Sequence, residues 1–283
     1  MSDDRGEIGQ ILVALDGSSV ARSAAGLAVQ IASSRGLPIR GLNVVSDRLV
    51  MSQYSNYQEE LKRNPQLTSR PELVEQFTRQ GNNALLWLGD RCREQNVPLT
   101  TDILFGGVPE MLLQEARQSS LIAMGRRGYS HNNDPRHIGR NFRVVAQQAK
   151  APVLAGGDEQ KTVRRVLLAY NGTPGARKAL QWLVRQQKTP FDQIVVVTVQ
   201  PIRHVSRRRL SKLQRELDAS GLMGYEFISR RGLPAYRIAI AAAESQADLI
   251  VMGSYHHPIL LEWLLGGTVK GVLSRTRLPV MLV

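Results

Sequence analysis

The residues best suited to bind a ligand lie where apolar runs of the chain end. Gly125 and Gly128 enclose two arginines directly after the run 121–124, and Gly139 follows a polar loop and precedes a helical pattern. Glycines beside a helix start let backbone N–H groups close around phosphate, and the helix dipole adds attraction. Asp16 ends another apolar run and could accept hydrogen bonds from a ribose or an adenine amine. Ligands of open parallel sheets bind beyond the carboxyl ends of the strands, so these residues are expected at one edge.

Much of this pattern occurs twice. Three blocks recur in one order, residues 11–18 as 166–173, 121–125 as 249–253, and 151–154 as 278–281. Repeats of this length are whole domains and not solenoid units, so the sequence predicts two copies of one fold, at 1–157 and 158–283. A single continuous sheet, or an Asp16 far from Gly128, would contradict this interpretation. The join, 155–161, contains Gly156-Gly157 and is expected to be a short flexible connection.

Each half alternates strand-length apolar runs with helical patterns, which is typical of an α/β fold with a mainly parallel sheet. Five strands per half are expected, near 10–15, 40–45, 99–104, 120–124 and 152–155, and near 164–170, 193–199, 224–229, 248–252 and 279–283. Helices should begin after Ser18 or Ser19, the first of them ending near Gly36, and after Thr173, with further starts at Pro109 and Pro234. The first half also holds an extra polar stretch, 46–80, which predicts a short helix plus a loop over the sheet edge.

The chain resembles the universal stress protein family over nearly all of each half. The likeness is carried by Asp16 after a strand, by 42–44, 107–109 and 124–128, by Gly139, and by 151–154. A tandem universal stress protein implies two doubly wound domains of the adenine nucleotide alpha hydrolase-like type, each with a five-stranded sheet, paired through their last strands. Many family members bind ATP and others do not, so ATP is the implied cofactor.

In nucleotide-binding members the motif is a Gly, two residues, a Gly, nine residues, then a Gly followed by Ser or Thr. The first half matches at Gly125 and Gly128, has ten residues before Gly139, and carries Arg140 in place of the hydroxyl residue. Arg140 could grip a phosphate bidentately or fill the pocket itself, and both alternatives stay open. Arg126 and Arg127 are expected to add positive charge there. The resemblance implies adenine and ribose contacts at Asp16, Val44 and Met124, and phosphate contacts at Gly125, Gly128, Gly139 and Arg140.

The second half departs further from the motif. Asn171 replaces the acid, His256 replaces the second Gly, and Gly267 replaces the hydroxyl residue. A neutral amide and a bulky side chain favour a role without nucleotide for this half. The degenerate equivalents of the first site are Asn171, Val199, Met252, Gly253, His256, Gly266 and Gly267.

Positive charge is concentrated in the second half. The chain carries a net charge of +13, of which residues 1–157 contribute +3 and residues 158–283 contribute +10. A basic patch is formed by Arg207, Arg208, Arg209, Lys212 and Arg215. Such a cluster can attract nucleic acid, an anionic lipid surface or an acidic protein. The leucines at helical spacing in this segment and its lack of aromatics favour the simpler reading, a solvated helix face.

The remaining sequence features argue against a disulfide, a metal site and a catalytic site. The single cysteine, Cys92, allows no internal disulfide, and a polar N-terminus with no long apolar run predicts a cytoplasmic protein. His256-His257 lacks the further ligands of a metal site, and no hydroxyl has a His/Asp partner nearby in sequence, so neither metal nor catalytic residues are expected.

Three hypotheses follow from these features. The first is a non-catalytic stress-response protein whose N-terminal half binds ATP or another adenine nucleotide. The second is a nucleotide-independent scaffold whose basic half docks on an acidic partner, nucleic acid or a membrane surface. The third is an α/β enzyme such as a nucleotidyl transferase. The sequence names no protein partner, and it leaves open whether the internally paired chain dimerises again.

Overall fold

The structure is a computed structural model, and it describes residues 9–46, 70–128, 134, 136–159, 161–186, 191–200, 207–254 and 266–283. Ten strands form its centre. The first five are β1 (Gln10–Ala14), β2 (Ile39–Ser46), β3 (Leu99–Gly106), β4 (Ser119–Met124) and β5 (Val153–Ala155). The second five are β6 (Arg165–Ala169), β7 (Gln193–Gln200), β8 (Tyr225–Arg231), β9 (Leu249–Met252) and β10 (Val280–Leu282). Each predicted strand is present within two residues of its expected ends.

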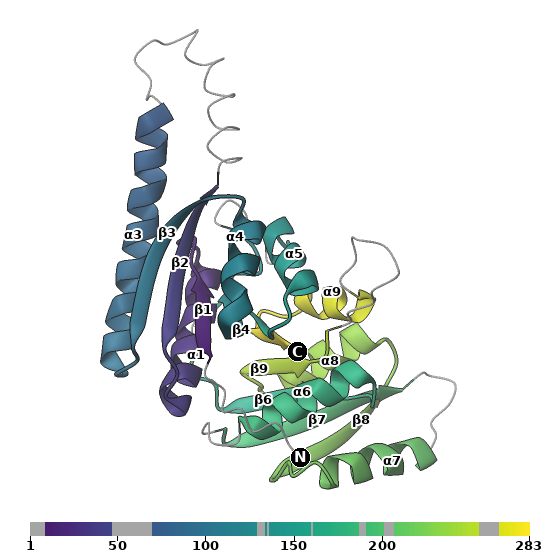
Figure 1. Cartoon of the computed structure of the whole chain (residues 1–283). Helices are drawn as coiled ribbons and strands as arrows, with labels where there is room; N and C mark the ends of the chain where they lie inside the picture. The colour runs from purple at the N-terminus through teal and green to yellow at the C-terminus, as the bar shows by residue number, and fades with distance from the viewer. Residues whose placement is uncertain are drawn as a thin grey trace, which may run out of the picture.

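The ten strands form one sheet, in the order β3-β2-β1-β4-β5-β10-β9-β6-β7-β8 (Figure 1). Within each half every pairing is parallel. The strands of the second half follow the same order as those of the first when the sheet is read from its opposite edge. The halves meet where β5 and β10 pair antiparallel, with Leu154 opposite Met281. The domains are therefore joined through their last strands, as the family resemblance implies.

This continuous sheet corrects the expectation that duplicated domains would keep separate sheets. Two copies that pair through equivalent edge strands give one sheet automatically, because the pairing hydrogen bonds continue the ladder across the seam. The antiparallel step at the seam is the mark of the duplication, since it reverses the direction of the second set of strands. A continuous sheet and two copies of one fold are thus compatible.

Helices cover both faces of the sheet. The first half contains α1 (Ser19–Arg35), α3 (Arg70–Glu94), α4 (Val108–Glu115), the short 3-10 helix η1 (Ala116–Gln118) and α5 (Arg140–Gln148). The second contains α6 (Pro174–Arg185), α7 (Arg207–Asp218), α8 (Pro234–Glu244) and α9 (Gly267–Leu273). One apolar core lies beneath α1, α3, α6 and α7, and the other beneath α4, α5, α8 and α9.

Local sequence explains where the two helices that follow the first strand of each half begin. Ser18 caps α1 by accepting a hydrogen bond from the Ala21 N–H, and Thr173 caps α6 in the same way through Ala176. Gly36 ends α1 in the left-handed conformation, with φ of 65°. These are the caps that the sequence predicts.

The extra stretch of the first half differs from its prediction. Residues 47–69 lie outside the described part of the chain, so the expected loop over the sheet edge stays a prediction. From Arg70 onward the chain is helical, and residues 70–80 are the first turns of the 25-residue helix α3 and not a separate short helix. Pro71 does not interrupt α3, because a proline in the first turn of a helix costs no hydrogen bond.

Candidate functional site at the carboxyl ends of the strands

Asp16 and Gly128 lie close together beyond the ends of β1 and β4. Asp16 is exposed, and its Oδ1 accepts hydrogen bonds from the Ser18 N–H at 2.9 Å and the Ser18 hydroxyl at 2.6 Å. A Cβ placed on Gly128 would lie 3.6 Å from Asp16 Oδ2. One carboxylate oxygen is therefore fixed by the start of α1, and the other faces the Gly-rich turn.

The other predicted residues of the first half surround this point. Met124 is buried at the end of β4, and Val44 is half-buried near the end of β2 on the same face of the sheet. Gly139 precedes α5, and its N–H donates to the Arg126 carbonyl at 2.8 Å, so this N–H is not available to a phosphate. Arg140, the first residue of α5, is exposed. The roles assigned to these residues, and to Gly125 between Met124 and Arg126, stay predictions.

Arg126 and Arg127, which were expected to add positive charge at this site, are buried beneath it. Arg126 is fully buried and Arg127 is 4% exposed. Their guanidinium groups lie 2.8 and 2.9 Å from the same oxygen of Asp158. Burial raises the pKa of Asp158, but the hydrogen bonds from Arg127 and Arg126 outweigh burial and hold that pKa below its usual value. The two arginines therefore pair with a carboxylate inside the protein, and their guanidinium groups are buried and not exposed to a ligand.

These arginines also fasten the first half to the second. Arg126 Nη1 lies 3.4 Å from the carbonyl oxygens of Leu273 and Leu278, both in the second half. Arg277, also in the second half, lies 3.8 Å from Asp158. A Gly-rich turn proposed to bind a ligand is thus tied directly to the junction of the halves.

The glycines of the join do not act as a flexible connection. A Cβ on Gly156 would lie 1.7 Å from the Val20 carbonyl oxygen, and one on Gly157 would lie 2.6 Å from the Arg277 carbonyl oxygen. Both distances are below any contact that a real Cβ makes, so glycine is required here for close approach of two backbones. The join is packed between the halves.

The equivalent place in the second half holds a cavity of about 380 Å³. Its lining includes Asn171, Val199, Met252, Gly253, Gly266 and Gly267, six of the seven degenerate equivalents predicted for this half. Asn171 Oδ1 accepts hydrogen bonds from the Thr173 N–H at 3.1 Å and the Thr173 hydroxyl at 2.7 Å, which repeats the arrangement of Asp16 and Ser18. The seventh residue, His256, lies outside the described residues, so the crowding expected from it stays a prediction.

This cavity of the second half has a neutral lining. No Lys, Arg, Asp or Glu is among its described lining residues, and its polar side chains are those of Tyr170, Asn171, Thr173 and Thr268. The Tyr170 hydroxyl donates to Glu216 at 2.7 Å. Burial and the Glu216 carboxylate raise the pKa of Tyr170 to about 12, so this phenol stays protonated at neutral pH and is not a base.

The described residues offer neither a metal site nor a membrane span. Among them, no three His, Cys, Asp or Glu side chains group as metal ligands, and His256-His257 falls outside this part of the chain. No helix in the described ranges is long and apolar enough to cross a membrane. Cys92 is buried in α3, and burial raises the pKa of its thiol to about 11, which keeps it unreactive.

Sequence reasoning missed the cluster of Arg126, Arg127 and Asp158. The signal was present as an arginine pair inside a Gly-rich turn and an aspartate directly after the Gly156-Gly157 pair. Their pairing could not be read from the sequence, because it depends on how the second half packs against the first.

Comparison with known proteins agrees with this architecture. Two doubly wound α/β units, with a Gly-rich turn beyond the fourth strand of the first unit, define the class of protein. A model of the universal stress protein family matches residues 7–155 and again 162–283. The chain belongs to the universal stress protein family, with two domains in tandem. The division at residue 157 itself stays a prediction.

Individual relatives are distant. Universal stress protein Slr1230 of Synechocystis sp. is 25% identical over 170 residues, which cover 57% of this chain and 56% of that protein, so little more than half of that relative is matched. The crystal structure of a universal stress protein from Archaeoglobus fulgidus matches 97% of this chain and 96% of its own, with 18% identity and a TM-score of 0.72. A putative universal stress protein from Pseudomonas aeruginosa matches 97% of this chain and 92% of its own, with 14% identity and a TM-score of 0.65. These two structures support the fold alone.

Proposed function

We propose that this chain is a regulatory binding protein of the universal stress protein family whose N-terminal half binds ATP or another adenine nucleotide without efficient catalysis. The observation that carries the proposal is the approach of Asp16 to Gly128, two residues 112 positions apart that meet beyond the strand ends. Ligands of doubly wound folds bind at such a place.

The residues there suit the parts of a nucleotide. Asp16 Oδ2 is an acceptor for the hydroxyls of a ribose, and Val44 and Met124 supply an apolar wall for a base. The first N–H groups of α5 and the exposed Arg140 carry the positive charge that phosphates need, since Arg126 and Arg127 are paired with Asp158. Phosphate binding in this half therefore depends on Arg140 and on backbone N–H groups.

The second half is less suited to a charged ligand. Its cavity offers an amide at Asn171 in place of a carboxylate, and no lysine or arginine among the described residues that line it. A triphosphate would leave its charge unpaired there, which is unfavourable. We therefore assign nucleotide binding to the first half.

Catalysis is not part of the proposal. The carboxylate nearest the site, Asp16, accepts hydrogen bonds from Ser18 and is not positioned as a general base by a partner of its own. Any hydrolysis of ATP should be slow. Release of phosphate or pyrophosphate well above background would instead favour an enzyme.

Titration with a fluorescent ATP analogue tests the proposal. Asp16→Ala should weaken binding by removing the ribose acceptor, and Gly128→Trp should abolish it because the indole would occupy the space in front of Asp16. Asn171→Ala is the matched control in the second half and should bind as the parent chain does. Binding that survives Asp16→Ala and is lost in Asn171→Ala would move the site to the second half.

A second candidate function rests on the basic face of α7. Arg207, Arg208, Arg209, Lys212 and Arg215 are all exposed on this helix, which lies beside β8 at the end of the sheet (Figure 1). This face could dock the chain on an acidic protein, a nucleic acid or an anionic membrane surface. Partner binding of this kind should fall steeply with salt. Neutralising Arg207, Arg208 and Arg209 should flatten that salt dependence, and an unchanged slope would remove this candidate.

A further inference from the structure

The cavity of the second half has an apolar wall and the size of a small-molecule site. Its volume is about 380 Å³, within the range of such sites. The wall is built by strands β7 and β9 and by helices α8 and α9, which contribute Val197, Val199, Ile238, Met252 and Val269. A wall of this kind favours a ligand that buries apolar surface of its own.

Asn171 presents a hydrogen-bond donor where the first half presents an acceptor. Its Oδ1 accepts a hydrogen bond from the Thr173 N–H, and a backbone N–H cannot donate to an amide NH2 group, so this contact fixes which way the Asn171 amide faces. Asn171 Nδ2 has no hydrogen-bond partner in the part of the chain that the structure describes, which leaves it for a ligand. At the same place in the first half, Asp16 leaves a carboxylate oxygen for a ligand instead.

The other polar side chains of this lining are uncharged, and two of them already have partners. The Tyr170 hydroxyl donates to Glu216, and the Thr173 hydroxyl donates to Asn171. The Thr268 hydroxyl has no hydrogen-bond partner among the described residues, and it can donate or accept. A carboxylate or phosphate would meet no cation among the described residues that line this cavity, which disfavours an anionic ligand.

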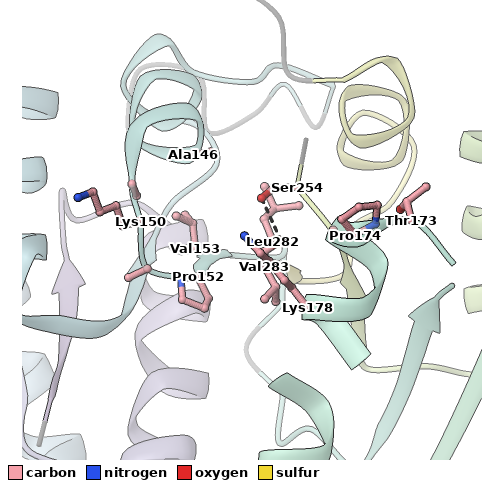
Figure 2. A pocket seen from close by; sticks show the side chains of 13 residues that line it. Ala146, Lys150, Pro152, Val153, Thr173, Pro174, Lys178, Ser254, Leu282 and Val283 are labelled. Atoms are coloured by element: carbon pink, nitrogen blue, oxygen red, sulfur yellow. Dashed lines mark hydrogen bonds between the residues drawn. The ribbon is translucent and has the colours of Figure 1, made fainter. Parts of the chain in front are cut away.

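A neighbouring cavity of about 350 Å³ lies at the seam between the halves (Figure 2). The two cavities share Thr173, beside the start of α6. Lys150 and Lys178 belong to the lining of the seam cavity, so its chemistry differs from that of the cavity of the second half. Asn171 and Val269 line the cavity of the second half and not the seam cavity. Substitutions at these two positions therefore distinguish the two places.

We propose that the cavity of the second half binds an uncharged, mainly apolar small molecule that carries a hydrogen-bond acceptor, such as a carbonyl oxygen or a ring nitrogen. The acceptor receives a hydrogen bond from Asn171 Nδ2, and the apolar body packs on Val199, Met252 and Val269. The difference between Asp16 and Asn171 thus gives the two halves ligands of different charge. This site goes beyond the proposed nucleotide function and does not depend on it.

Calorimetric titration of the full chain with coumarin-3-carboxamide and coumarin-3-carboxylate tests this proposal. The two compounds share their rings, their ring carbonyl and nearly their size, and they differ in charge. The neutral amide should bind saturably at about millimolar concentration or below. The anion should bind about tenfold more weakly or worse, because it would bury its charge without a partner.

Asn171→Asp tests the donor, because it gives the second half the acid of the first. The new carboxylate can still accept hydrogen bonds from Thr173, so the turn before α6 is kept. The Kd for the neutral amide should rise by about tenfold, since a carboxylate cannot donate to a carbonyl oxygen. Asp16→Asn, the reciprocal change in the first half, is the matched control and should change this Kd by less than about twofold.

Val269→Phe tests the apolar wall. Val269 stands three residues after Gly266 as Phe142 stands three residues after Gly139, so this variant carries the larger side chain of the first half into the cavity. The Kd for the neutral amide should rise by about tenfold or more, because the phenyl ring takes up space that the ligand needs. Circular dichroism and the urea midpoint verify that the variant folds, and Asn171→Asp decides the matter if it does not.

Three outcomes would overturn the proposal. They are an absence of saturable binding of the neutral amide, binding of the anion as tight as that of the amide, and a Kd for the amide that Asn171→Asp leaves unchanged. Gly128→Trp, which should abolish binding of the ATP analogue, should leave binding of the neutral amide unchanged. Failure of the proposed nucleotide site and failure of this site therefore give different results.

Discussion

At the level of single residues, the carboxylate of Asp158 holds two arginines inside the protein. Arg126 and Arg127 are buried, and each makes its charge-assisted hydrogen bond to the same oxygen of Asp158. Buried guanidinium groups are tolerated only when they are paired, because removing a charge from water is costly. The pair was expected to add positive charge at the Gly-rich turn, and its actual partner is set by the packing of the two halves.

Asp158→Asn should therefore be strongly destabilising. Loss of the carboxylate leaves two buried cations without a counter-charge, and the free energy of unfolding should fall by about 3 kcal/mol. Urea unfolding followed by circular dichroism measures this change. Asp192→Asn is the control, because Asp192 and Arg164 form an exposed pair 3.8 Å apart, and its effect should stay within about 0.5 kcal/mol. Equal effects of the two substitutions would show that the Asp158 cluster is not a structural lock.

The same aspartate should make stability depend on pH. Its pKa is lower in the folded chain than the ordinary aspartate value of about 3.9, so its contribution is complete above that value. The contribution is lost as the pH falls through the folded pKa. The difference in unfolding free energy between the parent chain and Asp158→Asn should accordingly be largest near neutral pH and shrink below about pH 4. A difference that stays constant down to pH 3 would contradict this assignment.

At the level of elements, glycines set how closely the join approaches the first helix. Gly156 donates its N–H to the Met124 carbonyl at 3.0 Å while its Cα faces the Val20 carbonyl of α1. Any side chain would push β5 away from α1. Because β5 also forms the seam with β10, this displacement would reach the second half.

Gly156→Ala should consequently cost several times more stability than an ordinary glycine substitution. The Cβ would lie 1.7 Å from the Val20 oxygen, so we expect a loss of about 3 kcal/mol, comparable to overpacking of a core. Gly267→Ala is the matched control, since a Cβ there meets nothing within 4 Å, and it should be close to neutral. Thermal unfolding of both variants measures the contrast. Similar midpoints for the two would show that the join can move aside.

The positions of the strands and of the helix ends were the part of the fold that the sequence predicted best. The runs around Ile11, Ile194 and Leu249 mark buried strands because their apolar residues are uninterrupted. Ser18, Thr173 and Gly36 mark helix ends because their side chains or conformations satisfy specific backbone groups. The length of α3 was harder, since Pro71 and the polar residues near its start are typical of a loop. The length of α3 depends on its packing against β2 and β3.

The candidate site was predictable only in part. The meeting of Asp16 and Gly128 follows from strand order, which the repeats and the βαβ pattern indicate. The side-chain directions of Arg126 and Arg127 do not follow from local sequence, because the carboxylate and carbonyl groups that they contact lie 31 to 152 residues away.

At the level of the whole molecule, the two domains share a core. The cluster beneath α1, α3, α6 and α7 includes Leu154 of β5 and Met281 of β10, which face each other across the seam. Asp158, Gly156 and Gly157 add polar and backbone contacts at the same junction. A core that crosses the seam couples the stability of the halves.

Unfolding should therefore occur in one transition for both halves. Trp87 reports on the first half and Trp182 on the second. The chain has three tryptophans. Two variants, one that keeps only Trp87 and one that keeps only Trp182, with the remaining tryptophans replaced by phenylalanine, should show the same midpoint in urea within experimental error. Separate midpoints would mean that the halves unfold independently and that the seam is a weak interface.

The binding assignment is tested most directly by native mass spectrometry of the full chain with added ATP. We predict one nucleotide per chain, with an occupancy that is unchanged in Asn171→Ala, reduced in Asp16→Ala and lost in Gly128→Trp. Two nucleotides per chain, or a nucleotide retained by Asp16→Ala and lost by Asn171→Ala, would contradict the assignment of the site to the N-terminal half.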